Sequence, residues 1–529
     1  MSNAQQLLDE LTRKLAEADE ATRPIPAATP PVGHRRLCVG MATFDDFDGV
    51  WFTVQAIRLY HPEVADDLSF IVLDNHPEGA TAADLKGLDQ RVPGLRYLPF
   101  RGYRSTAARD LIFRESDADV VVCLDSHVLV KPGGLAAVLD WFDRHPDSRD
   151  LIQGPLLSDD LTQVVGTHFA PTWGGGMYGQ WDTDERIDDP DAEPFDIPMQ
   201  GLGLFACRRD AWPGLNPRFR GFGGEEGYLH EKFRQAGGRV LCHPAVGWVH
   251  RFTRPSGPPY RPTWEDRVRN YRIGWGEVGW DPTPVEEHFR AHIGEIPGAD
   301  PELILAQTAR QVANPFSYFD AIFALNLDEA TDRWQEAQQR HRVLDIGWRV
   351  ERIPAVATPD NHHRGCAWSW RAMVAEADRR GYEHVLIFED DAVFLDTTLE
   401  VMARATAELA HQSWDLCFLG ACVHAQEFPL VDGCEVLQEC GLVTCTHALA
   451  VHRQAFAQIL ADLPDPEAPE AEAAMDAWLD EWVAIDQYFG RRLTDGTFRG
   501  LITTPRVATQ PALATYADAD AALGDRYVI

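Results

Sequence analysis

The sequence predicts an α/β protein built from two units in tandem, each with a mostly parallel sheet covered by helices, joined by a helical connection. Short apolar runs alternate with amphipathic stretches from residue 37 onward, and the same alternation begins again near residue 322. Between them, residues 280–315 show helical periodicity, several prolines and no strand pattern. We therefore expect four segments: an N-terminal helix with a Pro-rich linker (1–33), a first domain (34–281), a helical linker (282–317) and a second domain (318–529).

Continuous apolar runs predict the strands, because strands covered on both faces of a sheet carry few polar residues. In the first unit these runs are Leu37–Met41, Phe70–Leu73 and Val120–Leu124. In the second unit they are Ile322–Leu327 and Val385–Phe388, with a helix between them that runs through Arg340. Near the N-terminus, leucines on one helical face predict a docking or dimerising helix, and so a homo-oligomer: Leu7, Leu8, Leu11 and Leu15.

The charge and hydropathy of the chain exclude several functions. The 529 residues include 48 Lys and Arg against 82 Asp and Glu, a net charge of −34, which repels phosphate backbones and argues against nucleic-acid binding. No apolar run approaches the roughly 20 residues of a membrane span, and the N-terminus lacks a basic start followed by an apolar stretch. The ten cysteines include no C-x-x-C pair. We expect a cytoplasmic protein with reduced thiols.

Acidic residues follow three predicted strands of the first unit. Asp45 and Asp46 come after the first strand, Asp74 after the second and Asp125 after the third. Because the carboxyl ends of parallel strands meet at one edge of a sheet, these carboxylates are expected to lie together. They suit a nucleotide sugar, since they can bond ribose and uracil and hold a divalent cation on the diphosphate. A single Asp after a strand is often a turn or cap residue, but three favour a binding site.

The third strand runs into Asp125-Ser126-His127. In an extended segment Asp125 and His127 point to the same side, so a carboxylate oxygen and an imidazole nitrogen can bind one metal ion. A D-x-H is weak evidence in isolation. It belongs here to an ordered series of motifs: Arg104 to Asp110, Gly201 to Arg209, G-F-G-G-E-E at 221–226, and V-G-W-V-H-R at 246–251.

This series, over roughly residues 35–280, resembles the family 2 glycosyltransferases, and its D-x-H, G-G-E and V-G-x-x-H-R segments resemble the polypeptide N-acetylgalactosaminyltransferases in particular. The resemblance implies a GT-A fold, which is a Rossmann-like sheet, and a nucleotide-sugar donor. It also implies that Mn²⁺ or Mg²⁺ is bound by Asp125, His127 and His250. The nucleoside or donor would be contacted by Asp45, Asp74 and Arg109, and the acceptor would be faced by Glu225 and Glu226.

Two departures from that family pattern bear on mechanism. His250 lies two places later than in the polypeptide enzymes, so its ligand role needs a loop adjustment. Glu226 replaces their Asn, at the place where inverting family 2 enzymes have an Asp base. A carboxylate there can deprotonate an acceptor hydroxyl, which favours inversion over retention. The aromatic and Gly-rich stretch from Trp173 to Trp181 predicts either an acceptor groove or surface packing.

The second unit has an acidic strand end of its own, Glu389-Asp390-Asp391. Like charges this close repel each other, so the arrangement favours a bound cation, with a solvated turn as the alternative.

Further motifs surround these acids, and their order resembles glycosyltransferase family 25, which includes lipooligosaccharide and collagen galactosyltransferases, over residues 318–515. The motifs are N-L-D at 326–328, Arg333, G-C at 365–366, His447 within 441–450, and Asp486 within 484–488. The resemblance implies a second GT-A domain in which Asp390 and Asp391 hold metal and diphosphate. The nucleotide pocket would include Asp328 and Arg333, with Asp486 as a base and His447 as a further pocket group. Trp370 stands where that family usually has His.

Together these patterns predict a bifunctional, metal-dependent glycosyltransferase that adds two sugars in sequence, from UDP-sugars, to a hydroxyl of a peptide, protein or saccharide. One alternative keeps a single catalytic domain and makes the other a carbohydrate- or peptide-binding module. A second is a sugar nucleotidyltransferase, although such enzymes usually carry a Gly-rich basic loop where this chain has the acidic Met41–Phe47. A scaffold without chemistry leaves the clustered acids unexplained. The donor sugars, the acceptor and the linkage are left open by the sequence.

Overall fold

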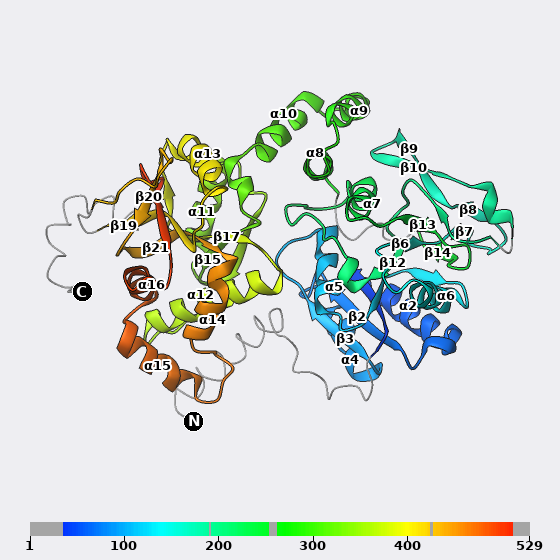
Figure 1. Ribbon diagram of the computed structural model, residues 1–529, viewed down its shortest axis with the longest axis horizontal. Coiled ribbons are helices and arrows are strands. Elements are labelled where there is room, and N and C mark those ends of the chain that lie inside the picture. The colour runs from blue at the N-terminus through cyan, green and yellow to red at the C-terminus, as the bar shows by residue number, and fades with distance from the viewer. Residues whose placement is uncertain (1–34, 190–191, 253–261, 424–426, 511–529) are drawn as a thin grey trace. The chain divides into compact units, whose positions relative to one another are not determined.

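The computed structural model describes residues 35–189, 192–252, 262–423 and 427–510. The chain forms two compact units, which divide between Val312 and Ala313 inside the expected helical connection (Figure 1). The predicted N-terminal helix and linker (1–33) lie outside the described residues, and so does any oligomer contact they make. No helix in the described part of the chain is both long and apolar enough to cross a membrane.

An eight-stranded sheet forms the centre of the first unit, and its register explains why the acids meet. The strand order is β11-β13-β6-β12-β4-β1-β2-β3. Strand β1 runs parallel to both β2 and β4, with Thr43 opposite Asp74 and Ala42 opposite Asp125. The ends of three strands therefore lie side by side. The strands are β1 (Leu37–Thr43), β2 (Leu68–Asp74), β3 (Leu95–Pro99), β4 (Val120–Asp125), β6 (Leu151–Gln153), β11 (Phe195–Asp196), β12 (Leu204–Arg208) and β13 (Val240–Cys242).

Two smaller sheets and a set of helices complete the first unit. A four-stranded sheet has the order β5-β14-β7-β8, and β9 and β10 form a hairpin. These strands are β5 (Val128–Val130), β7 (Leu156–Leu157), β8 (Val164–Gly166), β9 (His168–Gly174), β10 (Met177–Asp182) and β14 (Trp248–His250). The helices are α2 (Phe47–Tyr60), α3 (Ala82–Lys86), α4 (Leu88–Arg91), α5 (Asp110–Glu115), α6 (Gly134–Arg144), α7 (Glu226–Gln235), α8 (Trp264–Glu277), α9 (Thr283–Gly294) and α10 (Pro301–Val312), with short 3-10 turns η1 (Pro62–Val64), η2 (Thr106–Arg109), η3 (Glu185–Asp188) and η4 (Arg209–Ala211).

The region expected to connect the two domains is helical, and its helices pack on the first unit. Helices α9 and α10 lie against α8 through buried apolar side chains: Val268, Tyr271, Trp275, Val285, Phe289, Ile293 and Leu305. The exact ends of the four predicted segments stay a prediction.

The second unit is built on a seven-stranded sheet with the order β16-β15-β17-β21-β19-β22-β20. Leu325 of β15 lies opposite Glu389 of β17, so the N-L-D and E-D-D motifs meet at one edge. Its strands are β15 (Ala321–Asn326), β16 (Val350–Pro354), β17 (His384–Glu389), β19 (Leu416–Cys422), β20 (Leu437–Cys440), β21 (Thr444–His452) and β22 (Gly500–Thr503), with β18 (Val393–Phe394) paired to β23 (Ala508–Thr509). Its helices are η5 (Pro315–Tyr318), α11 (Thr331–Val343), α12 (His362–Arg379), α13 (Thr398–Leu409), α14 (Arg453–Asp462), α15 (Ala471–Trp482) and α16 (Ile485–Thr494).

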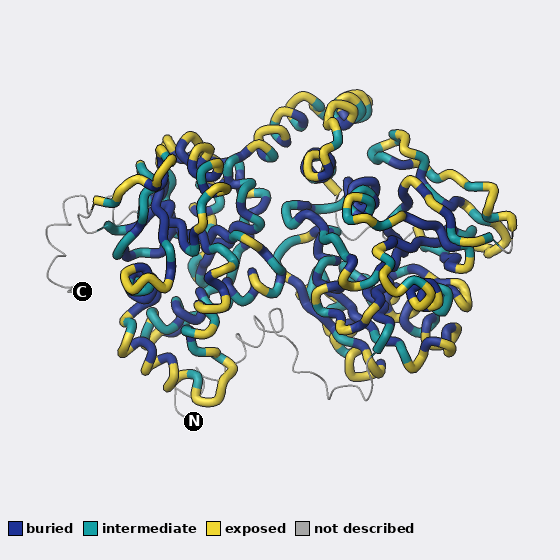
Figure 2. Tube along the Cα trace, in the orientation of Figure 1, coloured by how far each residue is buried: buried dark blue, intermediate teal, exposed yellow. Residues whose placement is uncertain are grey.

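The predicted apolar strands are all present, and in each unit the buried residues concentrate on the sheet (Figure 2). Both sheets are mixed: parallel pairings outnumber antiparallel ones in the first, as predicted, whereas in the second the two kinds are equal in number. Strand β12 runs antiparallel to β4, and β21 runs antiparallel to both β17 and β19. An apolar run shows that a strand is buried but does not carry its direction, and edge or returning strands are often antiparallel in such sheets.

A glycine in β1 brings the α5 segment close to the sheet. A β-carbon built on Gly40 would lie 2.1 Å from Cγ2 of Ile112 in α5, whose side chain is fully buried. Arg109 is the last residue of η2 and directly precedes α5. The absence of a side chain at Gly40 therefore sets the distance of Arg109 from the sheet edge.

We predict that Gly40→Ala destabilises the first unit by about 1–3 kcal/mol, because the stiff, β-branched Ile112 cannot move aside without repacking. Hydrogen exchange in β1 and α5 peptides of the full chain measures this change. The control is Gly276→Ala in α8, where an added β-carbon meets nothing within 4 Å. That change should be neutral or stabilise the helix by about 0.5–1 kcal/mol. Equal exchange at α5 in the wild type and Gly40→Ala would contradict the packing argument.

Candidate functional site

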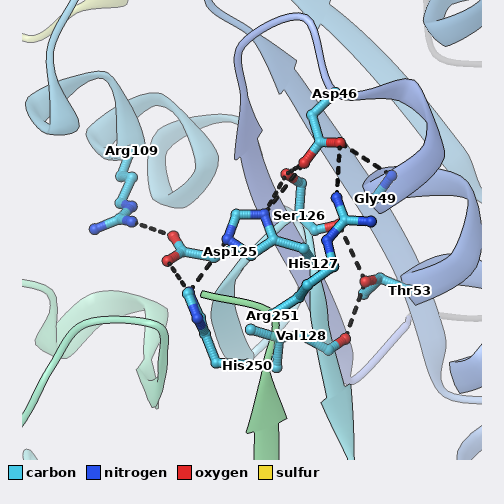
Figure 3. A network of polar contacts seen from close by, with 10 residues as sticks. All are labelled: Asp46, Gly49, Thr53, Arg109, Asp125, Ser126, His127, Val128, His250 and Arg251. Carbon is cyan, nitrogen blue, oxygen red and sulfur yellow. Dashed lines mark hydrogen bonds and ion pairs between the residues drawn. The ribbon is translucent and has the colours of Figure 1, made fainter. Parts of the chain in front are cut away.

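Three predicted metal ligands converge at the edge of the first sheet (Figure 3). Asp125 ends β4, His127 follows in the next turn, and His250 ends β14. Strand β14 pairs with β5 so that His250 lies opposite Val128, which places its ring beside His127. The two Nε2 atoms are 3.2 Å apart, and Nε2 of His250 is 3.3 Å from Oδ2 of Asp125. One ligand atom from each residue lies within 4.8 Å of the other two.

The chemistry of this donor set fits a divalent cation. Two imidazole nitrogens and one carboxylate oxygen suit a first-row transition ion. Both histidine side chains are nearly buried, 10% and 12% exposed. The Nδ1 atom of His250 is buried and has no hydrogen-bond partner among the described residues. Two Nε2 lone pairs that face each other are unfavourable unless a proton or a cation lies between them. Of the two ions that the family resemblance implied, the donor set therefore fits Mn²⁺ better than Mg²⁺, which prefers oxygen ligands.

Arg109 fixes the charge and direction of the Asp125 carboxylate. Its Nη2 lies 2.5 Å from Oδ1 of Asp125, which leaves Oδ2 turned toward His250. Burial by itself would raise the pKa of Asp125, but the Arg109 guanidinium and the hydrogen bond with His250 outweigh it and hold this pKa well below its ordinary value. Asp125 is therefore an anion at neutral pH, as a metal ligand must be.

Helix α2 holds the turn that carries His127. Asp46 caps this helix, with Oδ1 accepting from the Gly49 amide at 3.2 Å, and its Oδ2 lies 3.2 Å from Nδ1 of His127. The Thr53 hydroxyl donates to the carbonyl oxygen of Val128 at 2.9 Å. A carboxylate on Nδ1 keeps the proton there and presents the Nε2 lone pair to a ligand, as outer partners of metal-bound histidines do.

Asp46 is a functional candidate that the sequence pattern does not distinguish from Asp45. Both acids follow the first strand, and the family resemblance implies a nucleoside contact for Asp45 alone. The available signal was the D-x-H itself, because a ligating histidine needs a carboxylate or carbonyl on its second nitrogen. The sequence could not say which of two adjacent acids would provide it.

Asp45 and Asp74 lie at the same edge but in different surroundings. Asp45 has a positive φ of 52° and accepts from the Thr81 amide and hydroxyl at 2.9 and 3.0 Å. Asp74 is fully buried, where it accepts from the Tyr97 hydroxyl at 2.8 Å and the His76 amide at 2.9 Å. Burial raises the pKa of Asp74. The side chain of Asp45 is partly exposed, whereas that of Asp74 is enclosed and held by its own hydrogen bonds.

Glu225 and Glu226 are buried at the start of α7, where they are 1% and 8% exposed. Burial raises the pKa of both, and the charge of Glu225 raises that of Glu226 further, while Arg109 and Arg267 favour the ionised forms. Oε2 of Glu225 has no hydrogen-bond partner in the part of the chain that the structure describes. The charge of Arg109 thus acts on this pair as well as on the candidate metal ligand Asp125.

Two glycines before the glutamate pair allow the backbone to pass close to α8. Gly223 and Gly224 have φ values of 100° and 95°, which favour glycine. A β-carbon on Gly224 would lie 2.9 Å from the backbone nitrogen of Tyr271 in α8. The G-G-E motif therefore has a steric reason as well as a chemical one.

Two residues of the aromatic stretch have different surroundings, and an acceptor groove there stays a prediction. Trp173 stacks on His288 with 4.4 Å between ring centroids and lies 5.1 Å from Tyr271, so it packs on α8 and α9. Tyr178 instead lines a cavity of about 480 Å³ together with Trp280, Gly227 and other residues. The cavity borders the helix that begins with Glu226.

In the second unit, the aspartates after β17 lie against an arginine side chain of the same unit. Asp390 is 5% exposed, and its Oδ2 accepts from Nδ2 of Asn326 at 2.7 Å. The half-exposed Arg333 contacts Oδ1 of Asp390 and lies 3.7 Å from Oδ2 of Asp391. A guanidinium thus stands where the sequence predicted a metal ion. Within the described ranges, the acids at this edge do not bring three ligand atoms as close together as the cluster around Asp125 does.

Glu389 is the acid of this edge that the sequence analysis did not assign a role. Its Oε1 accepts from the Thr446 hydroxyl at 2.7 Å and its Oε2 from Nε2 of Gln510 at 3.3 Å. Burial, together with the charges of Asp391 and Asp486, raises the pKa of Glu389 to about 7. No sequence signal separates it from its two acidic neighbours.

The other predicted residues of the second unit are placed as follows. Oδ2 of Asp486 accepts from the Cys445 amide at 3.1 Å, near the start of α16. Asp328 pairs with Arg352 at 2.8 Å and is more than half exposed. His447 is 1% exposed, and burial lowers its pKa. Trp370, the departure from the family pattern, is fully buried in the core, 5.2 Å from Phe489 between ring centroids.

Comparison with known proteins finds a family match within the first unit. Residues 38–210, about one third of the chain, match the model of the family described as Glycosyl transferase family 2. This range contains β1 to β4, the D-x-H and β12. The first unit is a mixed α/β domain in which residues 38–210 are similar to that family, and the match does not extend into the second unit. No match was found among curated proteins.

Solved structures that match include two glycosyltransferases. One is GalNAc-T7 with UDP, GalNAc and Mn²⁺, with 16% identity and a TM-score of 0.38, over 53% of this chain and 58% of that chain. The other is the mannosyltransferase PcManGT from Pyrobaculum calidifontis in complex with GDP-Man and Mn²⁺, with 16% identity and a TM-score of 0.33, over 59% of this chain and 81% of that one. This chain thus covers little more than half of GalNAc-T7.

We predict that Asp46→Asn weakens Mn²⁺ binding by the full chain about 10- to 100-fold, because the amide no longer fixes the proton on Nδ1 of His127. His127→Ala should weaken it further. Titration followed by the electron paramagnetic resonance of free Mn²⁺ measures both. Asp182→Asn, at an exposed position of β10, is the control for loss of one charge. If Asp46→Asn and Asp182→Asn change the affinity equally, Asp46 acts only through net charge.

Proposed function

We propose that this protein is a bifunctional, metal-dependent glycosyltransferase of the cytoplasm. The first unit transfers one sugar from a nucleotide donor, a UDP-sugar, to a hydroxyl group of a peptide, protein or saccharide, and the second unit adds another sugar to that product. The observation that carries the proposal is the convergence of Asp125, His127 and His250 beside two buried glutamates, in a domain whose sequence matches family 2. The donor sugars and the choice between peptide and saccharide stay open.

In the first unit, the proposed ligands would hold Mn²⁺, which supplies positive charge to the diphosphate as it leaves. Arg109 keeps Asp125 ionised and aimed toward His250. Asp46 holds His127 in the orientation and tautomer that a cation requires. Asp45 and the segment after Asp74 position the nucleoside at the same edge. These residues bind and orient the donor, so the proton transfer falls to another group.

Glu226 is the proposed base that takes the proton of the acceptor hydroxyl. Its burial and the neighbouring charge of Glu225 raise its pKa, and a base with a pKa near the working pH transfers protons efficiently. Arg109 and Arg267 favour its ionised form. A base that faces an in-line displacement favours inversion at the anomeric carbon, and a retaining outcome is the alternative. The cavity beside Tyr178 and Trp280 is a candidate place for the acceptor.

In the second unit, the proposal assigns donor diphosphate and metal to Asp390 and Asp391, the nucleotide pocket to Asp328 and Arg333, the base to Asp486, and a further pocket contact to His447. Arg333 already neutralises the two aspartates, and its long, half-exposed side chain can turn to a diphosphate when a cation takes its place. Two sites in one chain raise the effective concentration of the first product at the second site.

Two alternative functions predict different reaction products. If the second unit only binds carbohydrate or peptide, its acids are not needed for transfer. If the protein is a sugar nucleotidyltransferase, it releases pyrophosphate from a nucleoside triphosphate and a sugar phosphate, which a glycosyltransferase does not.

We predict that Asp125→Ala and Asp391→Ala remove different steps. Full-length protein is incubated with Mn²⁺, a panel of sugar nucleotides, and peptide and saccharide acceptors, and the products are weighed by mass spectrometry. Asp125→Ala should lower the first transfer by about 100-fold or more, because charge stabilisation of the leaving group is the largest contribution. Asp391→Ala should leave the product with one sugar.

The matched controls are Asp182→Asn and the exposed Asp396→Asn, which remove a charge elsewhere in each unit. Chelation of the metal should stop both steps. Full two-sugar product from Asp391→Ala would make the second unit a binding module, and unchanged first transfer by Asp125→Ala would overturn the site itself.

We also predict a characteristic pH dependence of the first step. Because burial raises the pKa of Glu226, kcat/KM should fall as the pH falls through that raised value, which lies above the ordinary range of a carboxyl group. Glu226→Gln should lower kcat about 10²- to 10⁴-fold and abolish this acid limb. Glu231→Gln, on the same helix and partly exposed, should leave the profile unchanged. An acid limb that survives in Glu226→Gln would assign the base to another residue.

A further inference from the structure

Two cysteine thiols of the second unit contact each other. Cys422 ends β19 and Cys445 is the second residue of β21, on an antiparallel neighbour in which Cys422 lies opposite Thr444. The Sγ atoms are 3.3 Å apart. Both residues are partly exposed, whereas most other cysteines of the chain are buried: Cys38, Cys123, Cys207, Cys242, Cys417 and Cys440.

We propose that Cys422 and Cys445 are a reversible disulfide site that reacts with small-molecule disulfides such as oxidised glutathione. One cysteine thiolate attacks a sulfur of the glutathione disulfide, forms a mixed disulfide and releases one glutathione thiol. The second cysteine then displaces the other glutathione thiol and closes the protein disulfide. The protein loses two protons and two electrons, and one glutathione disulfide becomes two thiols, so the reaction is balanced.

The geometry needed for closure is close to what the strands already provide. A disulfide has an S–S distance of about 2.05 Å, so the two sulfurs must approach each other by only about 1 Å. Strands β19 and β21 pair with an irregular register just before Cys422, and Cys422 lies opposite Thr444, so closure is a local movement at the end of this pair. Cys445 has a positive φ of 68°, and this kink at the start of β21 turns its side chain toward β19. No large rearrangement is required.

The same short segment holds two acids of the edge described above. The backbone amide of Cys445 donates to Oδ2 of Asp486 at 3.1 Å. The side chain of the next residue, Thr446, donates to Oε1 of Glu389 at 2.7 Å. A movement of the Cys445 backbone therefore reaches both carboxylates through single hydrogen bonds. Disulfide closure is expected to change the protection of these segments, independently of any catalytic role they have.

The surroundings also set the speed of the reaction. The hydrogen bond with Cys422, burial, and the carboxylates of Asp486 and Glu389 all raise the pKa of the Cys445 thiol. The thiolate is the attacking species, so exchange should be slow at neutral pH and faster in mildly alkaline buffer. The experiment therefore uses long incubation above pH 8.

The test uses reduced full-length protein in glutathione buffers of graded redox potential, followed by alkylation of the remaining thiols. Cleavage after glutamate separates the two cysteines, because Glu427 and Glu439 lie between them. Mass spectrometry without reduction should then find a cross-linked pair of peptides, with fragment ions that place the bond between Cys422 and Cys445. Hydrogen exchange on the oxidised protein should change in the segments around Thr446 and Asp486.

Single variants separate a built pair from ordinary reactive thiols. In Cys445→Ser, Cys422 should stop at the mixed disulfide with glutathione, and in Cys422→Ser no cross-link should form. Cys434→Ser, which removes another partly exposed cysteine, should leave the cross-link unchanged. The proposal is overturned if both thiols remain alkylatable at potentials where Cys434 carries glutathione, or if the bond joins either cysteine to a different partner.

Discussion

The structure depends on how carboxylates at a sheet edge are neutralised. Parallel register places Asp125 and Asp74 beside the end of β1, and it places Glu389 beside the end of β15. Acids gathered in this way repel each other in a partly buried setting, so positive charge must come from the chain or from a bound ion. In a protein of net charge −34, the few cations near these edges are therefore decisive. Arg109 pairs with Asp125 at the first edge, and Arg333 pairs with Asp390 at the second.

The two units meet this requirement differently. In the first, Arg109 contacts one oxygen of Asp125 and leaves the other facing two imidazole nitrogens, so a donor set stays open for a cation. In the second, Arg333 contacts Asp390 and lies near Asp391, while burial, together with the charges of Asp391 and Asp486, raises the pKa of Glu389 to about 7. A cation enters the first edge without displacing a side chain, whereas at the second edge it competes with a guanidinium. This difference gives the two proposed active sites unequal support.

The sequence was sufficient for features that arise from local pattern. Apolar runs located β1, β2, β4, β15 and β17, and the acids directly after them located both edges. It was not sufficient for features that depend on pairing. The sheets proved mixed because burial does not encode strand direction. The position of His250 beside His127 depends on the three-residue strands β5 and β14, which are too short to show a periodicity. The choice between Asp45 and Asp46, or among Glu389, Asp390 and Asp391, depends on side-chain partners that only the fold reveals.

The charge of Arg109 acts both on the candidate metal ligand Asp125 and on the glutamate pair. Arg109 is 6% exposed, donates to Asp125 and favours the ionised form of Glu225. A cation bound at Asp125 would add positive charge near the same guanidinium, and positive charge near a buried carboxyl group favours its ionised form. Glu225 and Glu226 would then release their protons more readily when the cation is present. One buried guanidinium thus links the D-x-H electrostatically to the G-G-E-E motif, about a hundred residues further along the sequence.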